Sequence, residues 1–153
     1  MSEKVLFRAM KLIIILMGIC GIAFDVFLVP LTVAEKYDGT VEELIQWIYQ
    51  CIISVPCFWI LCLAWKICND MAKGRLFTFE NANRIYKSSI ALLVSVSAFL
   101  IGKIVFFLLG WNRELLIHLI ITIMGITFLI IMNVLGHYIR RAAELQEESD
   151  LTV

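Results

Sequence analysis

The chain has 153 residues and a formal net charge of zero, and 61% of its residues are hydrophobic against only 17% charged. A soluble domain of this length cannot bury so much apolar surface, so the composition and the mean hydropathy of +0.92 indicate that a lipid bilayer is the main solvent. The zero net charge provides no field that attracts nucleic acid, and we expect no direct nucleic-acid binding.

Four apolar runs are long enough to cross a bilayer, which takes about 20 helical residues. The first predicted helix covers residues 11–33, and the second covers 44–67 with Pro56 inside it. Because proline removes a backbone hydrogen bond, we expect a kink one turn before Pro56. The third predicted helix covers 88–109, and the fourth covers 115–136 and continues as a helix beyond its apolar part. The sequence therefore predicts one all-α domain, an integral membrane four-helix bundle.

Lysine and arginine alternate in frequency along the connecting segments. They are frequent before the first predicted helix, between the second and third, and directly after the fourth, and they are rare in the other two connections. Short loops rich in Lys and Arg stay on the cytoplasmic side. We therefore predict that both termini, the loop 68–87 and the tail 137–153 are cytoplasmic, in a multi-pass protein of the cell membrane.

The chemistry-bearing residues form none of the common catalytic or metal-binding patterns. The five cysteines include no CxxC pair and no Cys/His cluster, so we expect them to pack as small apolar side chains. No nucleophile–base pair, HExxH or phosphate-binding loop is present. We predict that the protein is not an enzyme and needs no cofactor.

Two charged residues lie inside predicted spans, Asp25 in the first and Lys103 in the third. Each lies about 14 to 15 residues past the inner end of its span, and at about 1.5 Å per residue both are roughly 21–23 Å from the inner face. A charge in lipid is costly unless it is paired or hydrated. We predict an Asp25–Lys103 ion pair that fixes helix packing, with a proton or ion relay as the alternative.

The predicted cytoplasmic loop contains a helix-start signal. Thr78 is a good N-cap, and Glu80 would lie in the positively polarised first turn of the next helix. Gly74 suits a turn, and Phe77 would dip into the membrane surface. The segment predicts either a helix start held at the interface or a docking surface for a cytoplasmic partner that includes Gly74, Phe77, Thr78, Glu80 and Asn81.

The C-terminal tail starts basic, with Arg140 and Arg141, and ends acidic, with Glu147, Glu148 and Asp150. Its residues are strong helix formers, and its acids disfavour contact with an anionic leaflet. The tail is either a solvated helix end or an acidic ligand for a basic partner.

Two of these segments resemble a known family. Residues 74–81, G-R-L-F-T-F-E-N, resemble the G-x-x-F-T-x-E-N loop of the bacterial membrane family called domain of unknown function 2975. Residues 145–153, L-Q-E-E-S-D-L-T-V, are similar to that family's L-x-E-E-x-D-L-T-[IV] ending, with Ser149 where Asn or Gln is common. The resemblance implies four spans and no established activity. Family members are often encoded beside a small helix-turn-helix regulator, which is an association and not a mechanism.

Three classes of function are compatible with these features. The favoured hypothesis is a membrane-bound regulatory or adaptor protein whose loop and acidic tail bind a cytoplasmic partner such as a helix-turn-helix regulator. The first alternative is a small transporter or channel subunit, with Asp25 and Lys103 along the path. The second is a peptide-toxin immunity protein. The sequence also allows a homo-oligomer.

Overall fold

The computed structural model describes residues 3–28, 41–111 and 115–151, and all of its regular structure is helical. Four of the described helices are long and apolar enough to cross a membrane, so the predicted all-α multi-pass membrane protein is confirmed. In chain order, the elements are α1 (Glu3–Ala23), the short π-helix η1 (Phe24–Leu28), α3 (Val41–Met71), α4 (Phe79–Leu108) and α5 (Leu115–Leu151).

The helices are longer than the apolar runs from which they were predicted. Most of the expected loop 68–87 is helical, and only residues 72–78 connect α3 to α4. A membrane span ends where the side chains become polar, whereas a helix continues as long as its backbone hydrogen bonds can form. The last part of the first predicted span, residues 29–33, lies outside the described residues.

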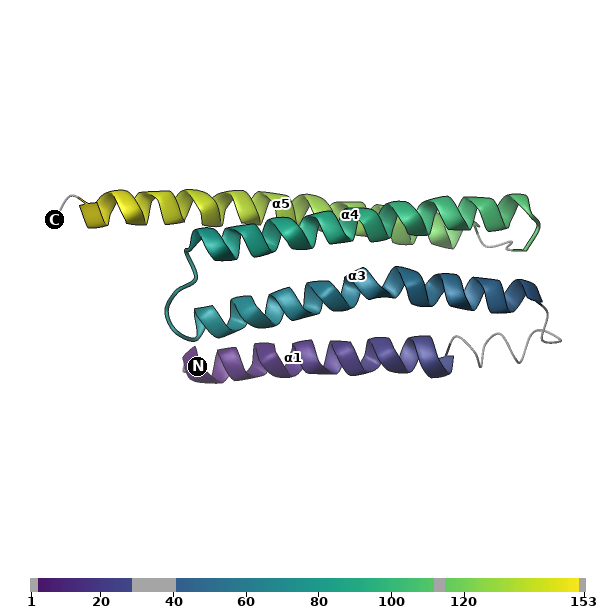
Figure 1. The fold of residues 1–153 in the computed structure, drawn as a ribbon, viewed down its shortest axis with the longest axis horizontal. Coiled ribbons are helices and arrows are strands. Elements are labelled where there is room, and N and C mark those ends of the chain that lie inside the picture. Colours follow the sequence, from purple (N-terminus) through teal and green to yellow (C-terminus); the bar gives the residue numbers. More distant parts are fainter. Residues whose placement is uncertain (1–2, 29–40, 112–114, 152–153) are drawn as a thin grey trace.

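The helices pack in chain order as an open layer. α1 lies against α3, α3 against α4, and α4 against α5 (Figure 1). Within the described ranges, no Cα atom of α1 lies within 8 Å of α4 or α5, and none of α3 lies within 8 Å of α5. The four long helices therefore do not surround a common central core.

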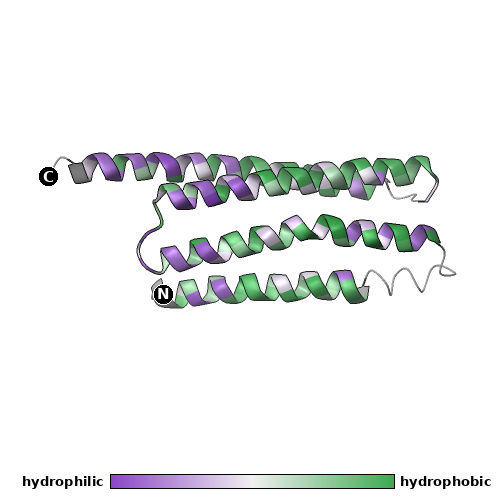
Figure 2. Cartoon of the chain, in the orientation of Figure 1, coloured by the Kyte–Doolittle hydropathy of each residue, from purple (hydrophilic) through white to green (hydrophobic). Residues whose placement is uncertain are grey.

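Both ends of the chain and the α3–α4 loop lie at one end of the layer, which we call the termini end (Figure 1). Hydrophilic residues gather there, and the middle of every helix is hydrophobic (Figure 2). Most large apolar side chains are exposed, as expected when lipid covers them. The last turns of α5 project beyond the other helices at this end (Figure 1).

Small and polar residues form the face that α4 presents to α3. Asn81, Ser88, Ser95 and Gly102 recur every seven residues along α4, and all four are buried. The Ser95 hydroxyl donates to the Ile53 carbonyl of α3 at 3.3 Å. Lipid supplies little hydrophobic drive for helix association, so close packing of small residues and interhelical hydrogen bonds hold such pairs together.

The tightest contact between these helices is Tyr49 of α3 on Gly102 of α4. The Tyr49 hydroxyl donates to the Ala98 carbonyl, and its ring packs edge-on against Phe106 at 5.2 Å between centroids. A Cβ atom at Gly102 would lie 2.1 Å from the Tyr49 hydroxyl oxygen and Cζ. Only glycine therefore accommodates this approach. Further along the chain, α3 contains Pro56, and this helix bends in its middle, as predicted (Figure 1).

The contact between α4 and α5 also depends on glycines. A Cβ at Gly136 would meet Ile85 Cγ2 at 3.1 Å, and one at Gly125 would meet Val96 Cγ2 at 2.7 Å. Close to Gly136, Ala82 and Ile85 of α4 pack with Ile139 of α5 in a small buried cluster. α5 is thus seated against α4 near the termini end.

We predict that Gly102→Ala weakens the α3–α4 contact by roughly 1–3 kcal/mol, because the new methyl group forces the Tyr49 ring out of its position. The measurement is the free energy of unfolding of purified protein in mild detergent. Gly18→Ala is the matched control, since a Cβ there meets only Leu61 Cδ1 at 3.9 Å. Equal stability of the two variants would show that Tyr49 can move aside without loss.

Candidate functional site

The α3–α4 loop, residues 72–78, is built by backbone hydrogen bonds to the last turn of α3. Gly74 N donates to Met71 O and Arg75 N donates to Asp70 O, both at 2.9 Å. Gly74 has a φ of +72°, which favours glycine, and this confirms the predicted turn. The chain therefore reverses within seven residues.

Thr78 caps α4 as the sequence predicts. Its backbone is extended (φ −132°, ψ 149°), and its hydroxyl oxygen accepts a hydrogen bond from Asn81 N at 3.2 Å. Glu80 lies in the first turn, where the helix dipole favours a carboxylate. The motif that resembles the family loop is therefore first of all a reversal followed by a capped helix.

Asn81 is fully buried and ties the loop to α4. Its Nδ2 donates to the carbonyls of Arg75 at 2.9 Å and Leu76 at 3.1 Å, and its Oδ1 accepts from Arg84 Nη1 at 2.8 Å. Asn81 therefore supports the loop from inside. It does not lie on the surface that we predicted for a partner.

Arg84 joins the two helices that flank the loop. Its Nη1 is paired with Asp70 of α3, and its Nη2 is paired with Glu80 of α4. Arg75 adds a longer contact to Asp70 at 3.6 Å. The hydrogen bond from Arg84 and the nearby positive charges hold the pKa of Asp70 below its usual range, although partial burial opposes this shift. Sequence reasoning did not find this clamp, because Asp70 lies on another helix.

The rest of the predicted docking residues are accessible. The loop presents Gly74 and Phe77, and Phe77 is 48% exposed. Glu80 is exposed next to them, with 71% of its side chain accessible although it is paired with Arg84. The network thus holds the backbone before the exposed Phe77 ring and pairs the Glu80 carboxylate with Arg84.

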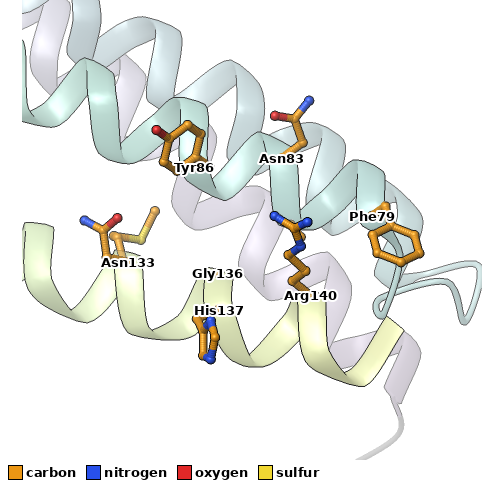
Figure 3. A pocket seen from close by; sticks show the side chains of 9 residues that line it. Phe79, Asn83, Tyr86, Asn133, Gly136, His137 and Arg140 are labelled. Carbon is orange, nitrogen blue, oxygen red and sulfur yellow. The ribbon is translucent and has the colours of Figure 1, made fainter. Parts of the chain in front are cut away.

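A groove separates the start of α4 from α5 beside this loop. Its volume is about 510 Å³, and Arg140 extends from α5 towards α4 across it (Figure 3). The Arg140 Nε also contacts Glu144 Oε1 at 3.3 Å. The groove combines aromatic walls, side-chain amides and a cationic rim, and it is lined by Phe79, Ala82, Asn83, Tyr86, Met132, Asn133, Gly136, His137 and Arg140.

Sequence reasoning did not find this groove. It assigned Arg140 only to the basic start of the tail, and it did not connect Arg140 with Phe79 and Tyr86, which are more than fifty positions earlier. A spacing signal was available only on each helix separately. The register between α4 and α5, set by Gly136 on Ile85, brings the two sets together.

The acidic tail continues α5 as a helix to Leu151, as predicted. Glu144, Glu147 and Glu148 are exposed on the last turns of α5, and the end of this helix projects beyond the layer (Figure 1). The Asp150 side chain lies outside the described part of the chain.

Asp25 and Lys103 do not form the predicted ion pair in this structure. The four salt bridges among the described residues join other groups, all near the termini end. The physical reason is the packing order, because α3 lies between the helices that carry Asp25 and Lys103. Asp25 is buried against α3, and its backbone carbonyl accepts a hydrogen bond from Trp47 Nε1 at 2.8 Å.

We predict that Asn81→Asp destabilises the loop by about 2–4 kcal/mol, because a carboxylate oxygen would face the Arg75 and Leu76 carbonyls without a donor between them. The checks are the free energy of unfolding in detergent and the rate of tryptic cleavage at Lys73 and Arg75. Asn83→Asp, on the same helical turn but exposed, gains the same charge and should have little effect. Similar losses in both variants would reject the internal role of Asn81.

The lowered pKa of Asp70 predicts a pH-dependent contribution to stability. This contribution is fully present above the unfolded-state pKa of about 3.9 and is lost as the pH falls through the still lower folded-state pKa. Asp70→Asn should therefore be less stable than the wild type at neutral pH, and the two should converge in strong acid. Unfolding midpoints measured across this range test it, with exposed Glu42→Gln at the opposite end as the control. If the difference in stability between the wild type and Asp70→Asn does not change with pH, the negative charge of Asp70 does not contribute to the clamp.

Comparison with known proteins places the chain in a family. It matches the family described as "Protein of unknown function (DUF2975)" over residues 32–153, which includes the loop, the groove and the tail. No curated protein and no solved structure matches the chain. The chain, a multi-pass membrane protein of four long helices, belongs to the DUF2975 family.

Proposed function

We propose that the protein is a membrane-bound adaptor that holds a basic cytoplasmic protein at the termini end. The main support is the end of α5, which projects beyond the layer, together with the exposed acids Glu144, Glu147 and Glu148 in its last turns (Figure 1). A solvated helix with one sign of charge attracts a partner of opposite sign and raises its rate of encounter. The alternation of Lys and Arg supports a cytoplasmic position for this end, in the cell membrane.

The α3–α4 loop provides a second contact in this proposal. Phe77 and Phe79 are 48% and 45% exposed, beside the Glu80 carboxylate. The buried Asn81 side chain holds the Arg75 and Leu76 carbonyls directly before Phe77, so ordering this backbone costs little conformational entropy on binding. An exposed aromatic ring on a rigid support is typical of residues that dominate binding energy.

The partner best suited to this surface is a small DNA-binding protein such as a helix-turn-helix regulator. Such proteins carry Lys and Arg that contact DNA phosphates. The acids of α5 would occupy the same basic residues, so membrane binding and DNA binding would compete. The adaptor would then hold the regulator away from its operator.

The alternative, a transporter or channel subunit, receives less support from the geometry. The described helices form a single open layer and enclose no path between them, because α1 and α5 are at opposite edges. Copies of the chain would have to close such a path together. The adaptor needs only the surfaces of one chain.

We predict that a purified helix-turn-helix regulator of the kind often encoded beside family members binds the full-length chain in detergent, and that a chain ending at Arg141 loses this binding. Glu147→Gln/Glu148→Gln should weaken it by roughly 3–10-fold at low ionic strength and less at high salt, since salt screens exposed charges. The measurement is the dissociation constant, obtained with the purified regulator.

The matched control is Glu42→Gln, the same chemical change on an exposed acid at the opposite end of the layer. Unchanged affinity for the regulator after removal of the residues beyond Arg141 would show that the tail is not part of the binding surface. Reporter fusions in residues 72–78 and at the C-terminus test the topology separately. Fusions on opposite sides of the membrane would exclude a joint surface.

A further inference from the structure

A second cavity lies in the half of the layer opposite the termini end. It has a volume of about 400 Å³, and four elements contribute to it: η1, α3, α4 and α5. It is lined by Phe24, Gln46, Trp47, Gln50, Phe99, Lys103, His118 and Ile121. α3, α4 and α5 each contribute polar side chains, and the rest of the lining is aromatic or aliphatic.

Lys103 is the charged centre of this cavity. Its ammonium group lies 5.5 Å from the centroid of the Phe99 ring, and that ring lies 5.7 Å from His118. Lys103 has no salt bridge within the described ranges, where every ion pair lies near the termini end. An ionisable side chain inside a membrane span that is not paired indicates a functional site.

Among the described residues, the two buried carboxylates of this half of the layer do not neutralise it, and the exposed Glu42 does not line the cavity. Asp25 and Glu43 are buried, but neither lines the cavity. The Glu43 carboxylate oxygens have no hydrogen-bond partner among the described residues. The lining of the cavity therefore carries a positive charge and no negative one.

Two amide side chains, Gln46 and Gln50, line the same cavity as the ammonium group. Gln46 Nε2 donates to the Trp111 carbonyl at 3.4 Å, which leaves Gln50 as the amide without a hydrogen bond to another described residue. A lysine and an amide donor together suit an oxyanion, which accepts several hydrogen bonds.

The depth of Lys103 indicates where such an oxyanion comes from. Lys103 precedes the last residue of α4, Leu108, by five positions, which corresponds to about 8 Å along the helix axis. This depth is close to the boundary between acyl chains and headgroups, where long cationic side chains reach lipid phosphates. Phe24, Phe99 and Ile121 offer the same occupant an apolar wall.

We propose that this cavity binds the phosphate headgroup of an anionic lipid, with Lys103 as its counter-charge and Gln50 as a hydrogen-bond donor. The site is separate from the loop and the tail. Failure of lipid binding would therefore not affect the adaptor proposal, and failure of the adaptor proposal would not affect lipid binding. It would make the placement of α4 between α3 and α5 sensitive to lipid composition.

The test uses the full-length protein in mild detergent, with dioleoyl phosphatidylglycerol and dioleoyl phosphatidylcholine added together and counted by native mass spectrometry. The wild type should retain one phosphatidylglycerol in preference to phosphatidylcholine. Lys103→Gln should weaken this binding by roughly tenfold, as the loss of one charge-assisted contact predicts. Lys103→Arg should retain it, and Lys73→Gln, on the exposed α3–α4 loop outside the helices, should behave as the wild type.

Unfolding curves in the same detergent show whether Lys103→Gln is folded. If it is not, Gln50→Leu provides the second readout, since it removes a donor without changing charge and should weaken lipid binding several-fold. Phosphatidylglycerol binding that is unchanged in these variants, or absent from the wild type, would overturn the proposal. Displacement by millimolar glycerol phosphate alone would assign the site to a soluble oxyanion and overturn the lipid assignment.

Discussion

The contact between α3 and α4 holds the whole layer together. α1 packs only on α3 and α5 only on α4 among the long helices, so the two outer helices are connected through this central pair. The pair is joined by small and polar residues, Ser95 on the Ile53 carbonyl and Gly102 under Tyr49, and by the Arg84–Asp70 clamp at its end. In lipid, where apolar surface is not hidden from water by packing, these specific contacts determine which helices are neighbours.

The same central pair positions both candidate sites. At the termini end, the Asn81 network fixes the loop and the start of α4, and the groove forms where α5 meets that start. At the opposite end, α4 places Lys103 between the amides of α3 and His118 of α5. A change in the α3–α4 register would therefore alter both ends, although they are far apart along the helices (Figure 1).

Much of the fold was predictable because hydrophobic length is a local property. The four spans, the turn at Gly74, the Thr78 cap and the helical continuation of α5 each depend on residues that are close in sequence. The role of Asn81 was not predictable in the same way. An asparagine at a helix start suggests an amide on the surface. Only the return of the loop over α4 buries Asn81 completely. The Asp25–Lys103 pair was inferred from equal depth, which does not determine whether two helices are neighbours.

The sequence by itself determined that this chain crosses a bilayer as four helices, with polar groups at defined depths. The reason is that the length of an apolar run and the positions of its charges are properties of each segment separately. Only the tertiary structure decided the order of the helices in the layer. It also decided that Arg84 pairs with Asp70 and Glu80, and that Lys103 shares a cavity with Gln50. These outcomes depend on how closely two backbones approach. That distance is set by the glycines at the helix crossings and by the side chains they face, which lie far apart in the sequence.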